Sequence, residues 1–257
     1  MKIATWNVNS LRVRLPHLLD WLRDTQPDVV GLQETKCVDA QFPYAELEAA
    51  GYHAVHNGQK TYNGVALLAR HPVQDVSRDM PGFEDEQKRV IAATVNGVRI
   101  VNVYVVNGQA LESDKYHYKL RWLAALREYL HAELQRYPQL ALFGDFNIAP
   151  APEDTHDPTV WEGQILCSEP ERAAFRALLD LGLSDSFRQF PHPPASFTWW
   201  DYRQAAFRRN LGLRIDHILL SASLAAGCRS CAADTAPRKL ERPSDHAPVV
   251  AELNAQN

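Results

Sequence analysis

Several largely apolar runs in the chain end in an acidic or amide side chain, and this pattern limits its folds most. Examples are Val29–Gln33, which Glu34 follows, Lys2–Asn7, and Leu140–Phe146, which contains Asp145 and precedes Asn147. Short apolar runs of this kind are typical of buried strands. Runs with helical spacing lie between them, so the sequence predicts an α/β or α+β fold.

Further strands are predicted along the whole chain. Asn96-Gly97 separates two of them and is a strong hairpin signal, so several strands are expected to pair as hairpins. These additional strands are expected at Asn63–Arg70, Arg89–Val95, Val98–Tyr104, Arg214–Ser221 and Ala247–Leu253.

Three helices are predicted from apolar residues at helical spacing. The first contains Leu15, Leu18, Leu19 and Leu22, and its Pro16 would be tolerated only in a first turn. The others are Asp114–Gln135 and Glu169–Leu181, with Gly182 as the C-terminal cap of the last. The Pro-rich segments Ala149–Pro158 and Phe190–Ala195 are too short for domain linkers, so residues 1–257 are expected to form a single domain.

Composition excludes some classes of protein and leaves others open. With 27 Lys and Arg against 31 Asp and Glu, the net charge is −4, which argues against a purely electrostatic nucleic-acid coat. A locally basic groove remains compatible with that total. No run approaches the apolar length of a membrane span or a signal peptide, and 4 Cys are too few for a disulfide scaffold. We therefore expect a cytoplasmic protein without a membrane partner.

The most informative polar residues lie where predicted strands end or begin. Each alone has an ordinary explanation as a turn residue, a strand-edge charge or a half-buried side chain. Strand ends at one edge of a sheet converge, however, and unpaired buried charge is costly, so together they indicate a site. The residues are Asn7, Glu34, Tyr104, Asp145, Asn147, Asp216, Asp245 and His246.

These residue types favour one kind of chemistry. Carboxylate and amide oxygens without Cys ligands suit Mg²⁺ or Mn²⁺. An Asp beside a His suits a dyad in which the carboxylate orients the imidazole. A metal that neutralises phosphate charge, with a group that activates water, would hydrolyse a phosphodiester.

Two basic clusters could hold phosphates, although a solvated charged face explains each equally well. Arg203, Arg208, Arg209 and Arg214 follow the pair Trp199-Trp200, and Lys115, Lys119 and Arg121 follow Asn107. Cys228 and Cys231 form a single CxxC, and because no second one exists to complete a zinc site, we expect ordinary thiols.

Five motifs in this order resemble the exonuclease III family, the AP-endonuclease branch of the endonuclease/exonuclease/phosphatase superfamily. They extend from residue 6 to residue 248. The motifs are Trp6-Asn7-Val8-Asn9, Leu32-Gln33-Glu34-Thr35-Lys36, Gly144-Asp145-Phe146-Asn147, Gly212-Leu213-Arg214-Ile215-Asp216-His217 and Ser244-Asp245-His246-Ala247-Pro248.

The resemblance implies a fold and an activity. The fold would be a four-layer α/β sandwich, with two packed mixed β-sheets flanked by helices. The activity would be Mg²⁺-dependent cleavage of double-stranded DNA 5′ to abasic sites, with 3′-to-5′ exonuclease action and cleaning of 3′ ends. Mn²⁺ could replace Mg²⁺, and the protein would act as a monomer.

The resemblance also implies a role for each matched residue. Glu34 would be the principal metal ligand beside Asn7, and Asp245 a further acid on the metal side. Asp145 and Asn147 would position the attacking water near the metal. His246 would contact the phosphate and lie within reach of the metal, oriented by Asp216, with Tyr104 on the phosphate side. Whether Asp145 or His246 is the general base stays open.

The substrate-binding residues include one departure from the family pattern. The family often has Tyr-x-Pro-Asn where this chain has Tyr104-Val105-Val106-Asn107, so the rigidity of that loop is in question while Asn107 remains a DNA contact. Trp199, Leu213 and Ile215 match the walls of the pocket for a base-less sugar, although a place in the core explains Trp199 equally well. Arg203 is expected to contact a phosphate because it adjoins this segment. Some relatives have an aromatic residue where Leu213 stands.

Two alternatives accompany this interpretation. A phosphodiesterase of the same superfamily could act on an inositol phosphate or a sphingolipid, but the sequence shows no apolar loop suited to a membrane. A catalytically inactive binding module would be expected to lack Glu34, Asp145 or His246, and all three are present.

Overall fold

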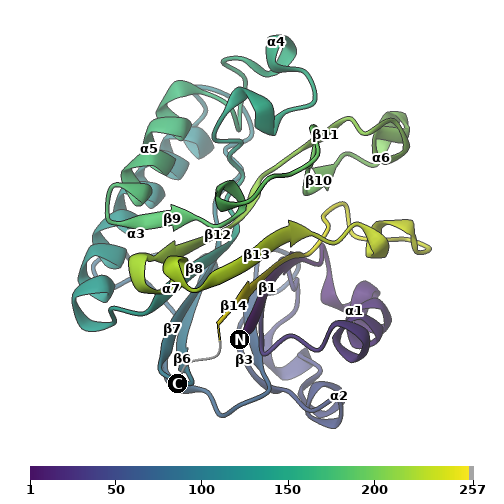
Figure 1. The fold of residues 1–257 in the computed structure, drawn as a ribbon, viewed down its shortest axis with the longest axis vertical. Coiled ribbons are helices and arrows are strands. Elements are labelled where there is room, and N and C mark those ends of the chain that lie inside the picture. Colours follow the sequence, from purple (N-terminus) through teal and green to yellow (C-terminus); the bar gives the residue numbers. More distant parts are fainter. Residues whose placement is uncertain (255–257) are drawn as a thin grey trace.

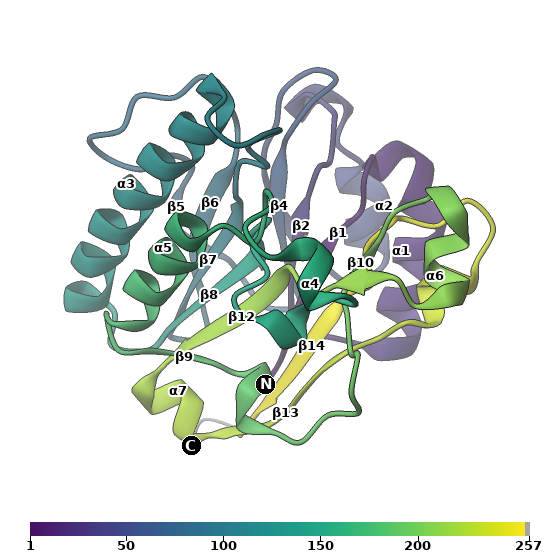
Figure 2. The ribbon, with the colours of Figure 1, turned by 90° about the horizontal axis from the view of Figure 1, so that it is seen from above.

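The computed structural model describes residues 1–254 and shows two six-stranded sheets packed face to face with helices outside (Figures 1 and 2). The first sheet has the order β13-β14-β1-β2-β4-β3, and the second β5-β6-β7-β8-β12-β9. β1 and β2 are parallel, as are β7 and β8, and the other pairs within these sheets are antiparallel. This arrangement confirms the four-layer sandwich of two mixed sheets.

The elements have the following bounds. The first sheet contains β1 (Lys2–Asn7), β2 (Val29–Gln33), β3 (His53–Asn57), β4 (Val65–Ala69), β13 (Cys228–Ala233) and β14 (Val249–Leu253). The second contains β5 (Gln74–Ser77), β6 (Val90–Val95), β7 (Val98–Tyr104), β8 (Leu140–Asp145), β9 (Leu183–Asp185) and β12 (Asp216–Ser221). A two-stranded ribbon joins β10 (Trp199–Trp200) to β11 (Gly212–Leu213). The α-helices are α1 (Leu11–Thr25), α2 (Tyr44–Ala49), α3 (Asp114–Arg136), α4 (Pro158–Trp161), α5 (Glu169–Leu179), α6 (Ala206–Arg209) and α7 (Ala222–Ala226).

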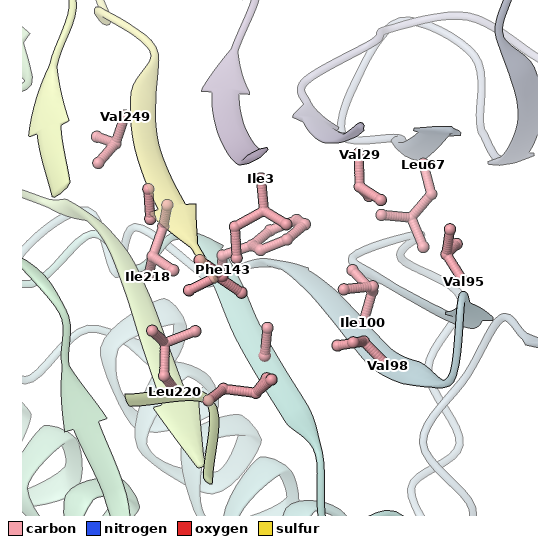
Figure 3. Packing of buried hydrophobic residues seen from close by; sticks show 14 of the residues in the cluster. Ile3, Val29, Leu67, Val95, Val98, Ile100, Phe143, Ile218, Leu220 and Val249 are labelled. Carbon is pink, nitrogen blue, oxygen red and sulfur yellow. The ribbon is translucent and has the colours of Figure 1, made fainter. Parts of the chain in front are cut away.

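Three apolar layers hold the sandwich together. Between the sheets, Ile3, Val29 and Leu67 of the first sheet face Phe143 and Ile218 of the second (Figure 3). A second layer packs α3 and α5 against the outer face of the second sheet, and a third packs α1 and α2 against the first sheet (Figure 2). None of the helices described is long and apolar enough to cross a bilayer.

The hairpin at Asn96-Gly97 is confirmed. Both residues have positive φ, 49° and 78°, and Val95 pairs with Val98, as a tight two-residue turn requires.

Two helix details differ from expectation. Pro16 lies inside α1, because the helix begins at Leu11, and its exposed surroundings let water bond the carbonyl that proline leaves unpaired. The C-cap of α5 is Asp180, and Gly182, with φ of 93°, belongs to the turn into β9.

A polar pair lies in the interior between the two sheets. Gln33 of β2 donates from Nε2 to Oδ1 of Asn102 on β7 at 2.7 Å and to the hydroxyl of Thr5 at 2.9 Å. The amide of Asn102 donates back to the carbonyls of Leu32 and Ala66 at 2.9 Å each. Buried polar groups must be bonded, so these contacts favour one register of the second sheet against the first.

Glycine at position 31 permits this close approach. A Cβ placed on Gly31 would lie 2.2 Å from Phe143 and 2.7 Å from the side chain of Asn102. Any larger residue would therefore push the two sheets apart at the point where Gln33 and Asn102 meet.

A buried charged cluster supports the other side of the second sheet. Arg214 donates to Asp154 at 2.6 Å and to Asp185 at 2.8 Å. Its Nη1 also lies 3.0 Å from Nδ1 of His217, whose Nε2 lies 2.9 Å from the carbonyl of Ile148. His217 is thus a neutral ring that donates from Nε2 and accepts at Nδ1. Burial first, and then the Arg214 charge, lower the pKa of His217 to about 4, although Asp185 and Asp154 oppose this.

The Asn102 contacts predict a large loss of stability when they are removed. Asn102→Ala should lower the free energy of unfolding by about 3 kcal/mol, because buried donors and acceptors lose their partners and a cavity forms. Thr94→Val is the matched control, since the buried hydroxyl of Thr94 has no partner and its loss should cost about 0.5 kcal/mol or less. Urea unfolding measures both, and equal losses in the two variants would contradict the role of Asn102.

His217 predicts a loss of stability in acid. Its pKa falls from the ordinary 6.5 to about 4 on folding, so the unfolded chain takes up a proton first as the pH falls. The stabilisation that comes from keeping His217 neutral is therefore present above pH 6.5 and is lost as the pH falls from there to pH 4. Between pH 7 and pH 5 the unfolding free energy of the unmodified protein should fall by about 2 kcal/mol more than that of His217→Gln. Parallel curves of unfolding free energy against pH would rule this out.

Candidate active site

The predicted site residues converge because strands from both sheets end at one edge. β1 and β2 are parallel, so Asn7 and Glu34 follow neighbouring strands of the first sheet. In the second sheet Tyr104 pairs with Asp145 across parallel strands, and Asp216 at the start of antiparallel β12 pairs with Asp145 on its other side. The site is therefore divided between the two sheets.

Glu34 sits on a turn with an unusual backbone. Its φ is 52° and that of Lys36 is 54°, both in the left-handed region that non-glycine residues seldom adopt. Backbone bonds hold the turn, since Ser10 donates to the carbonyl of Glu34 and Lys36 to that of Asn63. Such strain is tolerated where surrounding structure dictates it, often at functional sites.

Asn7 links the acidic groups of the two sheets. Its Nδ2 donates to Glu34 Oε1 at 2.9 Å and to Asp145 Oδ2 at 2.8 Å, while its Oδ1 accepts from the amide of Asn9 at 2.9 Å. The side chain thus presents its NH₂ group, not its oxygen, to the carboxylates. Lys36 adds an ion pair to Glu34 at 3.0 Å.

Three side chains at this edge have the spacing of metal ligands. One ligand atom each from Glu34, Asp145 and His246 lies within 4.8 Å of the others. The two carboxylate oxygens suit a hard divalent cation, and a cation would offset the repulsion between the two carboxylates. The residues present therefore fit the expected divalent metal.

His246 and Asp216 form the expected dyad. Nδ1 of His246 lies 2.9 Å from Oδ2 of Asp216, and Nε2 lies 3.7 Å from Oδ2 of Asp145. Burial disfavours the charged imidazole, but Asp216 and then Asp145 outweigh it, so the pKa of His246 is raised and the ring is held as a cation. Nδ1–H then donates to Asp216, and Nε2–H faces the site.

Asp145 lies at the centre of the site. Its Oδ1 accepts from the amide of Asn147 at 2.9 Å. Burial raises the pKa of Asp145, with a further contribution from the Asp216 charge, while His246 and the two bonds from Asn7 and Asn147 act in the opposite direction. A carboxylate whose pKa is raised in this way is a better proton acceptor than an ordinary Asp.

The two expected asparagines meet directly. Nδ2 of Asn107 donates to Oδ1 of Asn147 at 3.0 Å, and Nδ2 of Asn147 donates to the carbonyl of Val105 at 3.0 Å. Val106, which replaces the family's proline, is buried among the residues between the second sheet and α3. Burial of Val105 and Val106 thus anchors this loop without a proline.

Trp199 lies over Leu213 and Ile215, the two residues that were predicted to form a pocket wall with it. Leu213 and Ile215 are fully buried beneath the half-buried Trp199. Nε1 of Trp199 donates to Asp245 at 3.0 Å, and the other oxygen of Asp245 accepts from Asn9 at 2.9 Å. Asp245 therefore connects Trp199 to the first sheet and lies outside the metal-spaced group of Glu34, Asp145 and His246.

Two basic residues proposed as phosphate contacts are buried, and that interpretation was wrong for both. Arg214 is paired with Asp154 and Asp185, and Lys119 has no exposed surface and is paired with Glu171. Neither can reach a phosphate without breaking a buried ion pair. Arg203 is 84% exposed and forms an ion pair with Asp201 at 2.6 Å on the surface, so approach to a ligand would not break a buried pair.

Two further residues of the site, Thr198 and Ser244, are not predicted from the sequence. The hydroxyl of Thr198 donates to Asp216 at 2.6 Å and accepts from the amide of Asp216, so it fixes the carboxylate that orients His246. Ser244 donates to the carbonyl of Asn7 at 2.6 Å and accepts from the amide of His246. Ser244 stood inside a recognised motif, whereas nothing local distinguishes Thr198 from a core threonine.

Such a site can place a divalent cation beside a histidine that donates a proton, and phosphoester hydrolases use this combination. The model of the Endonuclease/Exonuclease/phosphatase family matches residues 4–246. The chain belongs to that family and, within it, to the exonuclease III and AP-endonuclease branch, which confirms the resemblance.

Three relatives illustrate this membership. Exodeoxyribonuclease III of Haemophilus influenzae is 40% identical, covering 98% of this chain and 100% of the relative. The structure of the 3′ phosphatase NExo from Neisseria, bound to a product DNA hairpin, is 54% identical with a TM-score of 0.98, covering 99% of this chain and 100% of that one. An AP endonuclease from Archaeoglobus fulgidus is 39% identical with a TM-score of 0.95 and the same coverage.

The three-residue group predicts divalent-metal binding that depends on Glu34. Glu34→Gln should weaken Mn²⁺ binding about tenfold or more, because a charged ligand is lost and Asn7 then bonds an amide instead of a carboxylate. Titration calorimetry measures this, with exposed Glu48→Gln on α2 as the matched control. Unchanged Mn²⁺ affinity in Glu34→Gln would show that Glu34 holds no metal.

Proposed function

We propose that the chain is a Mg²⁺-dependent DNA-repair phosphodiesterase that cleaves 5′ to abasic sites, degrades DNA from 3′ ends, or does both. The observation that carries the proposal is the position of Asp145. It ends β8 of the second sheet and lies between Glu34 and the cationic His246, which follow β2 and precede β14 of the first sheet. Two amide groups, from Asn7 and Asn147, hold it. A phosphate at this point would meet a cation, a proton donor and a proton acceptor together.

The metal would be held mainly by Glu34 and Asp145, with Asn147 and Asp245 as further proposed ligands. Asn7 and the protonated His246 would lie beside it, since both present N–H groups to the site. When bound, Mg²⁺ or Mn²⁺ would neutralise phosphate charge. Asn7 as placed donates to both carboxylates, so its proposed contribution is to set their separation.

We assign the general base to Asp145 rather than to His246. The raised pKa of His246 keeps Nε2 protonated, so it donates to a phosphate oxygen while Asp216 and Thr198 hold the ring in place. Asp145 and Asn147 then orient the attacking water, and Asp145 accepts its proton. Tyr104 contributes a hydroxyl on the phosphate side, since burial first and then the nearby carboxylates raise its pKa and keep it protonated.

Several surface features support DNA as the substrate. A groove of about 730 Å³ runs beside the site and is lined by Tyr62, Arg89, Asn107 and Lys115 among others. Arg89 stacks on Tyr104 with 4.7 Å between guanidinium and ring centre, which joins the groove to the site. The relatives include a 3′ phosphatase bound to DNA and an AP endonuclease.

The proposed function also includes a contact with the DNA lesion, an oligomeric state and a cellular location. Trp199, backed by Leu213 and Ile215, would contact a base-less sugar, and Arg203 a phosphate beside it. We propose action on double-stranded DNA with abasic or 3′-end lesions by a single-domain monomer in the cytoplasm.

Cleavage of two labelled duplexes tests the proposal. One carries an internal abasic analogue and the other a recessed 3′ end, each with Mg²⁺ and with EDTA. We expect Mg²⁺-dependent cleavage of at least one duplex. Incision at the analogue would identify an AP endonuclease, and shortening of the recessed end alone a 3′-to-5′ exonuclease.

Asp145→Asn should lower kcat by about a thousandfold or more, because the proton acceptor is lost, while DNA binding persists. Asp180→Asn, an exposed substitution at the C-cap of α5, is the matched control and should cleave normally. Cleavage of neither duplex by the unmodified protein would refute the proposed function. Normal turnover by Asp145→Asn would refute the assignment of the base.

A further inference from the structure

Lys119 of α3 is a buried cation that touches two loops of the site. Its ammonium donates to the carbonyl of Asn147 at 2.7 Å and to the carbonyl of Asn107 at 3.2 Å. Its third partner is the carboxylate of Glu171 on α5, and neither charged side chain has any exposed surface. All three donors of the ammonium are thus used inside the protein.

Glu171 is itself held in place. Its Oε1 accepts from the amide of Leu166 at 3.1 Å, and its Oε2 accepts from the amide and hydroxyl of Ser168 at 3.0 and 2.6 Å. Burial lowers the pKa of Lys119, while the Glu171 charge acts in the opposite direction. The pair is therefore a fully bonded buried group, which is the condition under which such a pair fixes local structure.

The two carbonyls belong to loops that follow neighbouring parallel strands. Asn107 follows β7 and Asn147 follows β8, and their side chains bond to each other at 3.0 Å. Asn147 has φ of 49°, so its peptide needs external support. Gly108 lets the loop after Asn107 pass close to the lysine stem, because a Cβ at this position would lie only 3.2 Å from Cδ of Lys119.

We propose that Lys119 is a positioning residue for the reaction. It binds the backbone of Asn107 and Asn147 and thereby sets the DNA-side asparagine against the water-side asparagine. The inference rests on the proposed function for its effect on turnover, but the positioning itself is a property of the folded chain. It also explains why a lysine in a basic cluster is directed inward.

The double variant Lys119→Met/Glu171→Gln tests this without leaving an unpaired buried charge. Its matched control is Arg99→Met/Glu133→Gln, which removes another buried ion pair, at the far end of β7 from Tyr104. We expect kcat on the cleaved duplex to fall about tenfold or more in the Lys119 pair, with KM changed less than about twofold. The control pair should keep the kcat of the unmodified protein.

The side-chain amide NMR signals of Asn107 and Asn147 provide a readout independent of activity. They should shift in the Lys119 pair and stay in place in the control pair. Equal kcat in the two pair variants, or unmoved asparagine signals, would overturn the inference. If the unmodified protein cleaves neither duplex, the proposed function fails, and the asparagine signals alone decide the positioning role.

A second variant covers the case in which the double variant does not fold. Lys119→Arg keeps a buried cation beside Glu171 but presents a planar group in place of the ammonium. It should retain the fold, shift both asparagine signals and lower kcat without a matching change in KM. Unaltered kcat and signals in Lys119→Arg would overturn the proposal.

Discussion

The hydrogen-bonded pair of Gln33 and Asn102 lies inside the otherwise apolar interior of the sandwich, and the site depends on it. Apolar side chains alone would let two sheets slide over one another at modest cost, because packing is not directional. Amide groups in the same place must find their partners or lose several hydrogen bonds. Gln33 directly precedes Glu34, and Asn102 lies two residues before Tyr104, so the bond that aligns the sheets also aligns the two halves of the site.

The site departs from ordinary folding rules in ways that its neighbours offset. Glu34, Asp145 and Asp216 bring negative charge together around one histidine, and Glu34 and Asn147 adopt left-handed backbone. Asn7 bonds the carboxylates of both Glu34 and Asp145, and Thr198 bonds that of Asp216. The buried Lys119 bonds the backbone carbonyl of Asn147. A sequence that departs from local preference at one place and supplies the matching donors elsewhere is characteristic of a functional site.

The sequence predicted the central strands and the convergence of their polar ends, because buried strands carry a strong apolar signal and parallel neighbours end at the same edge. The strands it missed in the two sheets are β3, β5, β9 and β13, which are the edge strands. β3, β5 and β13 are partly exposed and carry several polar residues, so their sequences resemble loops. The expected pocket residues Leu213 and Ile215 proved fully buried, because Trp199 covers them.

Charge alone did not reveal which basic residues face solvent. Arg214 and Lys119 are in basic clusters of the sequence, yet each is buried against carboxylates distant in the chain. Those partners are placed by tertiary packing, which a local pattern does not encode. The role of Thr198 is hidden for the same reason, since its contact with Asp216 depends on the ribbon of β10 and β11 lying against the start of β12.

The proposed metal site takes its ligands from both sheets. Anomalous diffraction from a crystal soaked in Mn²⁺ tests this most directly. We expect a peak bound by the carboxylates of Glu34 and Asp145 together, one from each sheet. A peak bound by residues of a single sheet, or no peak at this edge of the sandwich, would contradict it.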